Sequence, residues 1–397
     1  MNIKTIIPIL ASTILFASPS QELLDYQKYY TLCNETTNIN IANCFLNSKV
    51  NYNNVHGNPN SKNRIDKENF VKLNQYEKEY YIMNALLPQN ERYLKLENYL
   101  RFLYSIANEY EPTNFKKFEE KYTSSENIRK TKVILNLIQY EGLEESNYFD
   151  DELSNALFTF QKTHGLLENG KLWKETRREL NKSIKEIILK VKKNLEIERS
   201  VNNKAGTYVY INIPEYKMYY YVDNMLDLDM KVIVGKKRTR TPVFSDKIEF
   251  VVKNPNWNIP RNIYKKEYAH KSVEELRKKG LRYNSEGKLY QPPGKRNALG
   301  LVKFLFPNKY NVYMHDTNAK YLFKRSTRMF SHGCIRLEKP FELLNTLGYE
   351  YDTKKNRWHK LANKIPVHIE YHTVWIDENG VAQFRKDIYG YEKKLFM

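Results

Sequence analysis

The chain has 397 residues, 41% of them hydrophobic, and a formal net charge of +19 with a sequence pI of about 9.4. This length predicts two or three domains with enough chain to bury a core. No stretch after residue 20 approaches eighteen consecutive apolar residues, which excludes a membrane span in the mature protein. The charge predicts a polyanionic partner. The lysines are also scattered, as in KKEYAHKSVEELRKK, so an equally simple interpretation is that they only solvate exposed faces.

Residues 1–20, MNIKTIIPILASTILFASPS, have the pattern of a secretory signal peptide. Lys4 gives a positive start, Thr5 to Ala17 is apolar, and small residues follow, so we expect cleavage after Ala17 or Ser20. An uncleaved anchor stays open, whereas a lipoprotein anchor is not expected because no cysteine follows the apolar run. The signal predicts export to the periplasm. An exported protein rarely meets nucleic acid, so an anionic envelope polymer suits the positive charge better.

Three cysteines are present: Cys33, Cys44 and Cys334. Cys33 and Cys44 are near neighbours that could form a disulfide in an oxidising compartment. Cys334 is then the odd thiol of an exported chain, which makes it a candidate nucleophile. Burial of any of the three as a small hydrophobic residue is the alternative.

The first half of the chain has helical periodicity. Residues 21–135 predict a helical scaffold, with an apolar stripe formed by Leu96, Leu100, Leu103 and Ala107. Residues 136–182 predict a compact pair of helices around a turn at Gly165 and Asn169-Gly170, and residues 183–204 a linking helix.

The pattern changes to strands over residues 205–375. The segment TYVYINIPEYKMYYYVDNMLDLDMKVIVG alternates, and Asp223-Asn224 predicts a hairpin turn. Further strands are expected at 247–252, 300–306, 311–314 and 365–375, followed by a tail at 376–397. The predicted fold class is therefore multidomain α+β, with N-terminal helices and a mainly β domain.

An insert at 259–297 interrupts the β domain. Ser272 and Glu275 form a capping box at the start of a short helix, which Gly280 ends. A helix and loop inserted into a β domain are well placed to act as a lid over a site.

The candidate chemistry lies in FSHGCIRL at 330–337. A cysteine attacks a carbonyl as its thiolate and needs a neighbouring base, because an unperturbed thiol has a pKa of about 8.5. His332 is too close in sequence to be well aimed at Cys334, whereas His315 ends the predicted strand NVYMH and could reach it. Gly333 allows a sharp turn and frees nearby amides for an oxyanion.

The segment HDTNAKYLFKRSTRMFSHGCIRLEKP resembles the signature of the L,D-transpeptidase (YkuD-type) catalytic domain. The resemblance covers about residues 205–375, and INIPEYKMYYY, NPNWNIP and QPPGKRNALG are similar to the larger periplasmic (YcbB-like) branch. The run FQKTHGL with NGKLWKETRRELN is similar to a small peptidoglycan-binding module, and a generic helix pair is the alternative.

This resemblance implies a role for each motif residue. Cys334 is the nucleophile and His315 the general base and acid, with oxyanion donors at the Gly333 and Cys334 amides. His332 shapes the turn, Ser331 orients a histidine, and Arg336 fixes the loop or a substrate carboxylate. Trp257 and Tyr313 line the groove or only pack in the core.

The implied reaction is acyl transfer from peptidoglycan tetrapeptide stems through a Cys334 thioester, giving 3→3 cross-links. It needs no metal or organic cofactor, and carbapenems are expected to acylate the same thiol. An L,D-carboxypeptidase that trims tetrapeptides to tripeptides, or a non-catalytic wall-binding protein, are the alternatives. The acyl acceptor and the oligomeric state stay open.

A zinc site is the chemical rival, because His368, Glu370 and His372 recur at period two on one strand face. The opposite face, with Val367, Ile369 and Tyr371, already supplies the buried side. We therefore expect a solvated polar face and no bound metal.

Overall fold

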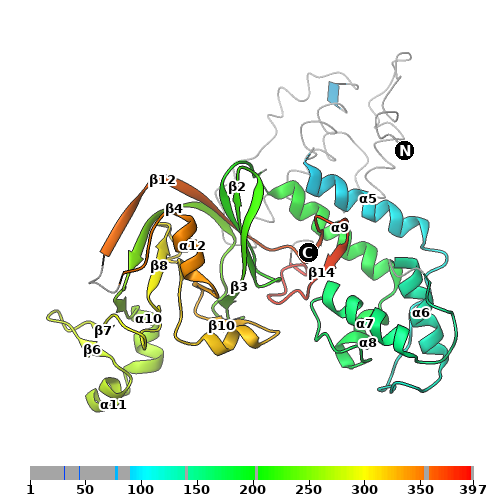
Figure 1. Cartoon of the computed structure of the whole chain (residues 1–397), viewed down its shortest axis with the longest axis horizontal. Coiled ribbons are helices and arrows are strands. Elements are labelled where there is room, and N and C mark those ends of the chain that lie inside the picture. The colour runs from blue at the N-terminus through cyan, green and yellow to red at the C-terminus, as the bar shows by residue number, and fades with distance from the viewer. Residues whose placement is uncertain are drawn as a thin grey trace.

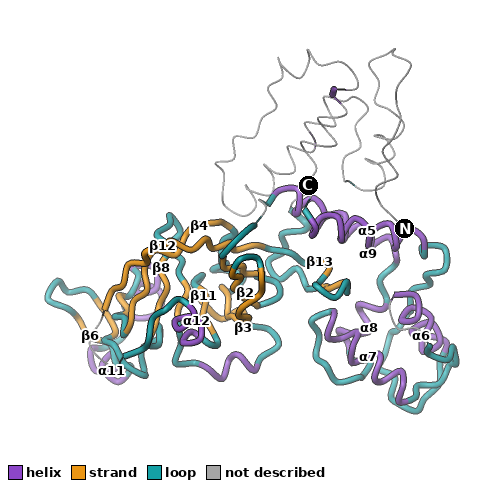
Figure 2. The backbone as a smooth tube through the Cα atoms, turned by 45° about the horizontal axis from the view of Figure 1, so that its top comes forward, coloured by secondary structure: helices purple, strands orange, loops and turns teal. Residues whose placement is uncertain are grey.

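The computed structural model describes residues 90–394 except 139–141, 202–203 and 353–356, together with residues 31, 44, 77 and 78. A helical body and a mainly β body lie side by side (Figures 1 and 2). The predicted signal peptide and most of the predicted scaffold before residue 90 lie outside the described residues. Within the described residues, no helix combines the length and apolar character that a membrane crossing requires.

Within the described residues, the helical body comprises five helices: α5 (Glu91–Ser105), α6 (Glu126–Ile138), α7 (Asp151–Thr163), α8 (Lys174–Leu180) and α9 (Ile184–Ser200). Asn90 and Asp150 cap α5 and α7 by accepting backbone N–H groups, and Ser183 opens α9 with a capping box. The predicted stripe is confirmed at Leu96, Leu100 and Leu103, which are buried in the helical core.

The turn between α7 and α8 is held by one buried glutamine. The Gln161 carbonyl oxygen accepts the amides of Asn169 at 2.7 Å and Gly170 at 2.9 Å. Gly170 has φ of +64°, and a Cβ there would lie 2.6 Å from the Ser154 hydroxyl. Only glycine fits this position, so the two helices form around the turn that the sequence predicts.

The β body is built on a nine-stranded sheet with the order β10-β3-β11-β9-β8-β4-β12-β1-β2. Its strands are β1 (Tyr208–Asn212), β2 (Lys217–Val222), β3 (Met225–Gly235), β4 (Phe244–Lys253), β8 (Val302–Leu305), β9 (Met314–His315), β10 (Met329–Ser331), β11 (Ile335–Leu337) and β12 (Arg357–Glu370). Asp223 and Asn224 adopt positive φ values of 49° and 68° between β2 and β3, which confirms the predicted hairpin. Helix α12 (Pro340–Thr346) and the short helix η4 (Lys320–Lys324) complete this body.

The insert lies at the end of the β body farthest from the helical body (Figures 1 and 2). It comprises β5 (Trp257–Asn258), α10 (Arg261–Ile263), η3 (Tyr264–Tyr268), α11 (Val273–Lys278), β6 (Arg282–Tyr283) and β7 (Leu289–Gln291). The predicted capping box of Ser272 and Glu275 is present. Leu276, Leu281 and Leu289 form a small core of their own, so the insert is a separate packing unit.

The C-terminal segment, predicted as a tail, contributes to both bodies. The hairpin β13 (Val374–Ile376) and β14 (Ala382–Phe384) places Ala382 and Phe384 in the helical core. Tyr389 and Tyr391 lie in the core of the β body. Residues 376–391 therefore belong to the fold and contact the cores of both bodies.

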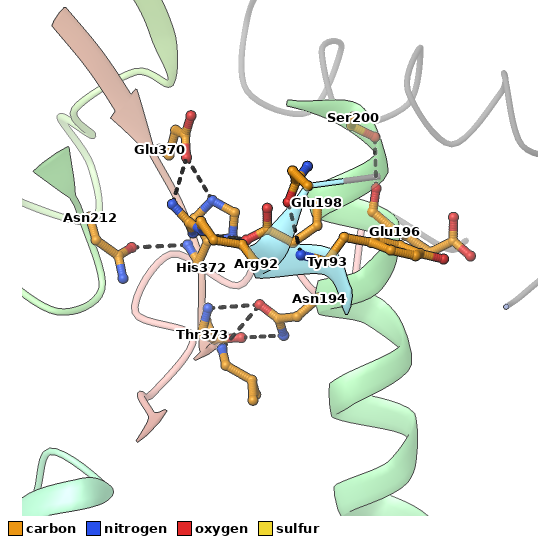
Figure 3. A network of polar contacts seen from close by, with 12 residues as sticks. Arg92, Tyr93, Asn194, Glu196, Glu198, Ser200, Asn212, Glu370, His372 and Thr373 are labelled. Atoms are coloured by element: carbon orange, nitrogen blue, oxygen red, sulfur yellow. Dashed lines mark hydrogen bonds and ion pairs between the residues drawn. The ribbon is translucent and has the colours of Figure 1, made fainter. Parts of the chain in front are cut away.

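A buried network of charges joins the two bodies, where a solvated face was expected (Figure 3). His372 Nε2 lies 2.8 Å from Glu370 and His372 Nδ1 lies 3.2 Å from Glu198 on α9. Arg92 on α5 pairs with Glu198 at 2.8 Å, and Lys204 pairs with Glu370 at 2.7 Å. Burial opposes ionisation of Glu370, but Lys204, His372 and Arg92 hold its pKa well below its usual range.

These contacts correct the expectation for the polar face of β12. Glu370 and His372 are buried because helices from the other half of the chain cover them. Among the residues that the structure describes, no group of three or more histidine, cysteine or acidic side chains is arranged to hold a metal ion.

We expect Glu370→Gln to lower the free energy of unfolding by about 3–5 kcal/mol, because it leaves the buried Lys204 ammonium without its carboxylate. Glu249→Gln is the matched control, since Glu249 pairs with Lys364 at a more exposed site and should cost about 0–1 kcal/mol. Urea unfolding of both variants measures the difference. Equal midpoints would contradict a stabilising role for the network.

Candidate active site

The candidate nucleophile lies where two parallel strands meet. Strand β11 pairs with β9 in the register Ile335 to Met314 and Arg336 to His315. The Ile335 amide donates to the Tyr313 carbonyl at 3.0 Å. Cys334, directly before β11, is thereby placed beside Tyr313, directly before β9.

The backbone of the loop before Cys334 is fixed by Ser331. Its hydroxyl donates to the Cys334 carbonyl at 2.5 Å and accepts the Gly333 amide at 3.1 Å. Gly333 has φ of +122°, a conformation that favours glycine. Ser331 therefore orients the loop backbone, where a histidine was the expected partner.

This geometry also changes the expected oxyanion donors. The Gly333 amide is already engaged by Ser331, so it is not free to bind an oxyanion. In the described part of the chain, the Cys334 amide has no acceptor. Cys334 is thus the better placed of the two predicted backbone donors.

A second set of hydrogen bonds holds the nucleophile loop against the turn between Gly235 and Thr241. The Thr241 hydroxyl donates to the Gly333 carbonyl at 2.8 Å and accepts the Gly235 amide at 2.9 Å. The Tyr389 hydroxyl donates to the Gly235 carbonyl at 2.7 Å and accepts the Thr241 amide at 3.2 Å. The C-terminal segment therefore fixes the turn on which the nucleophile loop lies.

The Cys334 thiol is free and partly exposed. It donates to the Asn311 carbonyl at 3.8 Å, and the amide and side chain of Tyr313 lie within hydrogen-bonding reach of it. Burial raises the pKa of this thiol, and Tyr313, Arg336 and Lys303 offset that shift only in part. The resting thiol is therefore protonated at neutral pH.

His315, the last residue of β9, is buried. Its Nδ1 donates to the Asp316 carbonyl at 2.5 Å, and its ring lies 5.6 Å from the Tyr313 ring. Burial, with Arg336 beside it, lowers the pKa of His315 to about 3, so the imidazole is neutral. No hydrogen bond joins His315 to Cys334 in the described structure, so their pairing stays a prediction.

The other predicted residues divide between the site and the insert. His332 Nε2 lies 2.6 Å from Glu267 Oε1, which joins the nucleophile loop to the insert. Arg336 shares the strand register of His315, and its Nε is buried without a hydrogen-bond partner. Trp257 pairs with Gln291 inside the insert's own sheet.

Two further cysteines were predicted to bond to each other. Cys44 is disulfide-bonded. Cys33, its predicted partner, lies outside the described residues.

Several residues of the site were not singled out from the sequence: Lys303, Asn311, Thr241, Glu267 and Tyr389. Lys303 had a usable signal, because it is the one charged position of the strand VKFL. Thr241 and Tyr389 had none, since their role depends on segments that meet only in the fold.

Residues 206–369 match the YkuD family, the L,D-transpeptidase catalytic domain. This part of the chain is therefore similar to that catalytic domain. A curated relative from Haemophilus influenzae, named "Putative L,D-transpeptidase", is 33% identical over 224 residues, which are 47% of this chain and 45% of the relative. The chain thus matches less than half the length of this relative.

Solved L,D-transpeptidases are also similar at lower identity. One from Stackebrandtia nassauensis is 15% identical, with 66% of this chain and 97% of that chain covered and a TM-score of 0.28. The catalytic domain of the E. faecium enzyme acylated by ertapenem is 16% identical, with 43% and 100% covered and a TM-score of 0.26.

We expect the rate of Cys334 alkylation by iodoacetamide to rise with pH through an apparent pKa above the ordinary thiol value of about 8.5. The reason is that burial disfavours the thiolate and His315 carries no charge near neutral pH. Intact-protein mass spectrometry measures the rate, with Cys334→Ser as the control for the alkylated site. A rate that is constant from about pH 5 to pH 8 would instead indicate a preformed thiolate.

Proposed function

We propose that the protein is a periplasmic peptidoglycan L,D-transpeptidase that forms 3→3 cross-links. The observation that carries the proposal is a free, partly exposed thiol at the start of β11, beside β9, in a domain that matches the L,D-transpeptidase catalytic family. The substrate class is the tetrapeptide stem, whose third residue offers the carbonyl that is attacked.

The first half-reaction forms a thioester. Cys334 Sγ attacks the carbonyl of the third residue, the C–N bond to D-Ala breaks, and the thiol proton passes to the departing amine. A neutral His315 can accept and return that proton, which a histidine already protonated could not do. The Cys334 amide is the candidate backbone donor for the oxyanion, and the Tyr313 hydroxyl lies beside the thiol.

The second half-reaction consumes the thioester. An amine of a second stem attacks it, an amide forms, and Cys334 is regenerated with its proton. Transfer competes with hydrolysis, so the thioester must be shielded from water until the amine arrives. The contact between Glu267 and His332 supports this role for the insert, because it holds the insert against the nucleophile loop.

Two further parts of the chain fit an insoluble anionic polymer. The α7–α8 unit, similar to a peptidoglycan-binding module, would hold the enzyme on the wall and raise the local concentration of acceptor stems. The net charge of +19 would attract the same polymer.

The direct test is incubation of the purified protein with tetrapeptide muropeptides, followed by chromatography and mass spectrometry. We expect cross-linked dimers and free D-Ala from the wild type, and neither from Cys334→Ser, because a hydroxyl is a much weaker acid than a thiol. Ertapenem should add one adduct to the wild type and none to Cys334→Ala. Tripeptide and D-Ala without dimers would favour an L,D-carboxypeptidase instead.

We expect Glu267→Ala to raise the ratio of tripeptide to dimer, because it removes the contact between the insert and His332. Glu274→Ala is the matched control, since Glu274 is an exposed acid of the same insert, in the first turn of α11. The muropeptide assay gives both products in one run. An unchanged product ratio in Glu267→Ala would show that this contact does not shield the thioester.

A further inference from the structure

One row of side chains crosses five strands on the site face of the sheet. The strand register aligns Arg336 with His315, His315 with Lys303, Lys303 with Val252, and Val252 with Trp358. Residues directly opposite each other on neighbouring strands present their side chains to the same face. Lys303 and Arg336 therefore flank His315 on either side.

Two aromatic rings hold the Lys303 ammonium in place. Its Nζ lies 5.5 Å from the centroid of the Tyr313 ring and 5.3 Å from that of the Trp358 ring. Such cation–π contacts fix the position of a cation but leave its charge unneutralised. Trp358 is 58% exposed, so this clamp borders solvent and a ligand can approach it.

Lys303 is half-buried and has no carboxylate partner among the described residues, unlike several lysines whose side chains are buried. In the described part of the chain, four lysines whose side chains are at most 14% exposed each pair with an acid: Lys132 with Asp150, Lys190 with Glu392, Lys204 with Glu370 and Lys253 with Asp352. No acidic side chain or other acceptor contacts Lys303 Nζ in the described ranges of the chain. A half-buried charge is normally paired, so the described protein leaves the Lys303 ammonium open to an anionic group of a ligand.

A second donor on the same row is also unused. Arg336 Nε is buried without a hydrogen-bond partner, two strands away from Lys303. Two half-buried cations beside a reactive thiol, with no acid between them, form an environment suited to an anion.

We propose that Lys303, held between Tyr313 and Trp358, binds a carboxylate of the acyl-donor stem and so determines donor specificity. The inference rests on the proposed function. A tetrapeptide stem offers two carboxylates near the attacked carbonyl: that of the terminal D-Ala and that of the third-residue side chain. Both present the same chemistry to an ammonium, and the experiment separates them.

The test compares three donor stems: one with both carboxylates free, one with a terminal carboxamide and one with a side-chain carboxamide. The rate of release of the terminal residue gives kcat/KM for each. A hydrogen bond between charged groups contributes about 1.5–3 kcal/mol, so the wild type should prefer the free acid to one of the amides by about ten- to a hundredfold. Lys303→Met should lose that preference. Its kcat/KM should fall for the stems that retain the recognised carboxylate and stay unchanged for the stem in which that carboxylate is an amide.

Two further variants make the result specific. Lys309→Met is the matched control, because Lys309 is exposed and its Nζ lies 5.2 Å from the Tyr310 ring, so it should keep the wild-type preference. Lys303→Arg retains the charge and should retain part of the preference. Thermal unfolding checks that each variant is folded. In Lys303→Met, the methionine side chain keeps an apolar stem between the Tyr313 and Trp358 rings.

Three outcomes would overturn the inference. Equal slowing of all three donors in Lys303→Met would mean that Lys303 acts only on the thiol. Equal rates for acid and amide donors in the wild type would mean that no carboxylate is recognised. A wild-type protein that releases D-Ala from no donor would overturn the proposed function as well, which distinguishes the two failures.

Discussion

The site depends on the parallel pairing of β9 with β11. This register places Met314 and Ile335 together in the core and His315 and Arg336 together on the opposite face. Because side chains alternate along a strand, a slip of one residue would turn His315 and Arg336 into the hydrophobic core and the apolar pair away from it. The hydrophobic core therefore fixes the side on which the thiol, the imidazole and the guanidinium meet.

Burial sets the resting charge state of this site. The thiol is disfavoured as an anion and the imidazole as a cation, so neither group is charged before substrate binds. The fixed charges are the two cations that flank His315. A negative charge that develops at the thiol or at the attacked carbonyl would lie near both cations, in surroundings that are partly shielded from water.

Local patterns in the sequence were enough to predict several elements. The Asp223-Asn224 turn, the Ser272 capping box and the apolar stripe of α5 each depend on residues that are neighbours along the chain. The candidate nucleophile also came from a short motif. In each case the interacting groups lie within one turn or strand, so their spacing carries the information.

Features that depend on distant segments could not be predicted in this way. Glu370 lies on a face that alternation assigns to solvent, yet Arg92 and Lys204 bury it at the boundary between the bodies. The Gly333 amide looked free because the bond it makes depends on the side-chain rotamer of Ser331. The sequence marks Lys303 as the one charged position of its strand, but only the fold shows that no acid pairs with it in the described residues.

The C-terminal segment lies outside the matched residues 206–369, yet it connects the helical body to the β body. Arg385 packs against Gly165 and donates to the Thr163 carbonyl at 2.7 Å, at the end of α7 in the helical body. Four residues later, Tyr389 holds the Gly235 turn beneath the nucleophile loop. Residues 385–389 therefore connect the end of α7 to the turn that supports the nucleophile loop. An excised fragment of residues 206–369 would keep the Cys334 thiol but lose the Tyr389 hydroxyl, which holds the turn beneath the nucleophile loop. The structural unit that supports the thiol therefore includes residues outside the matched range.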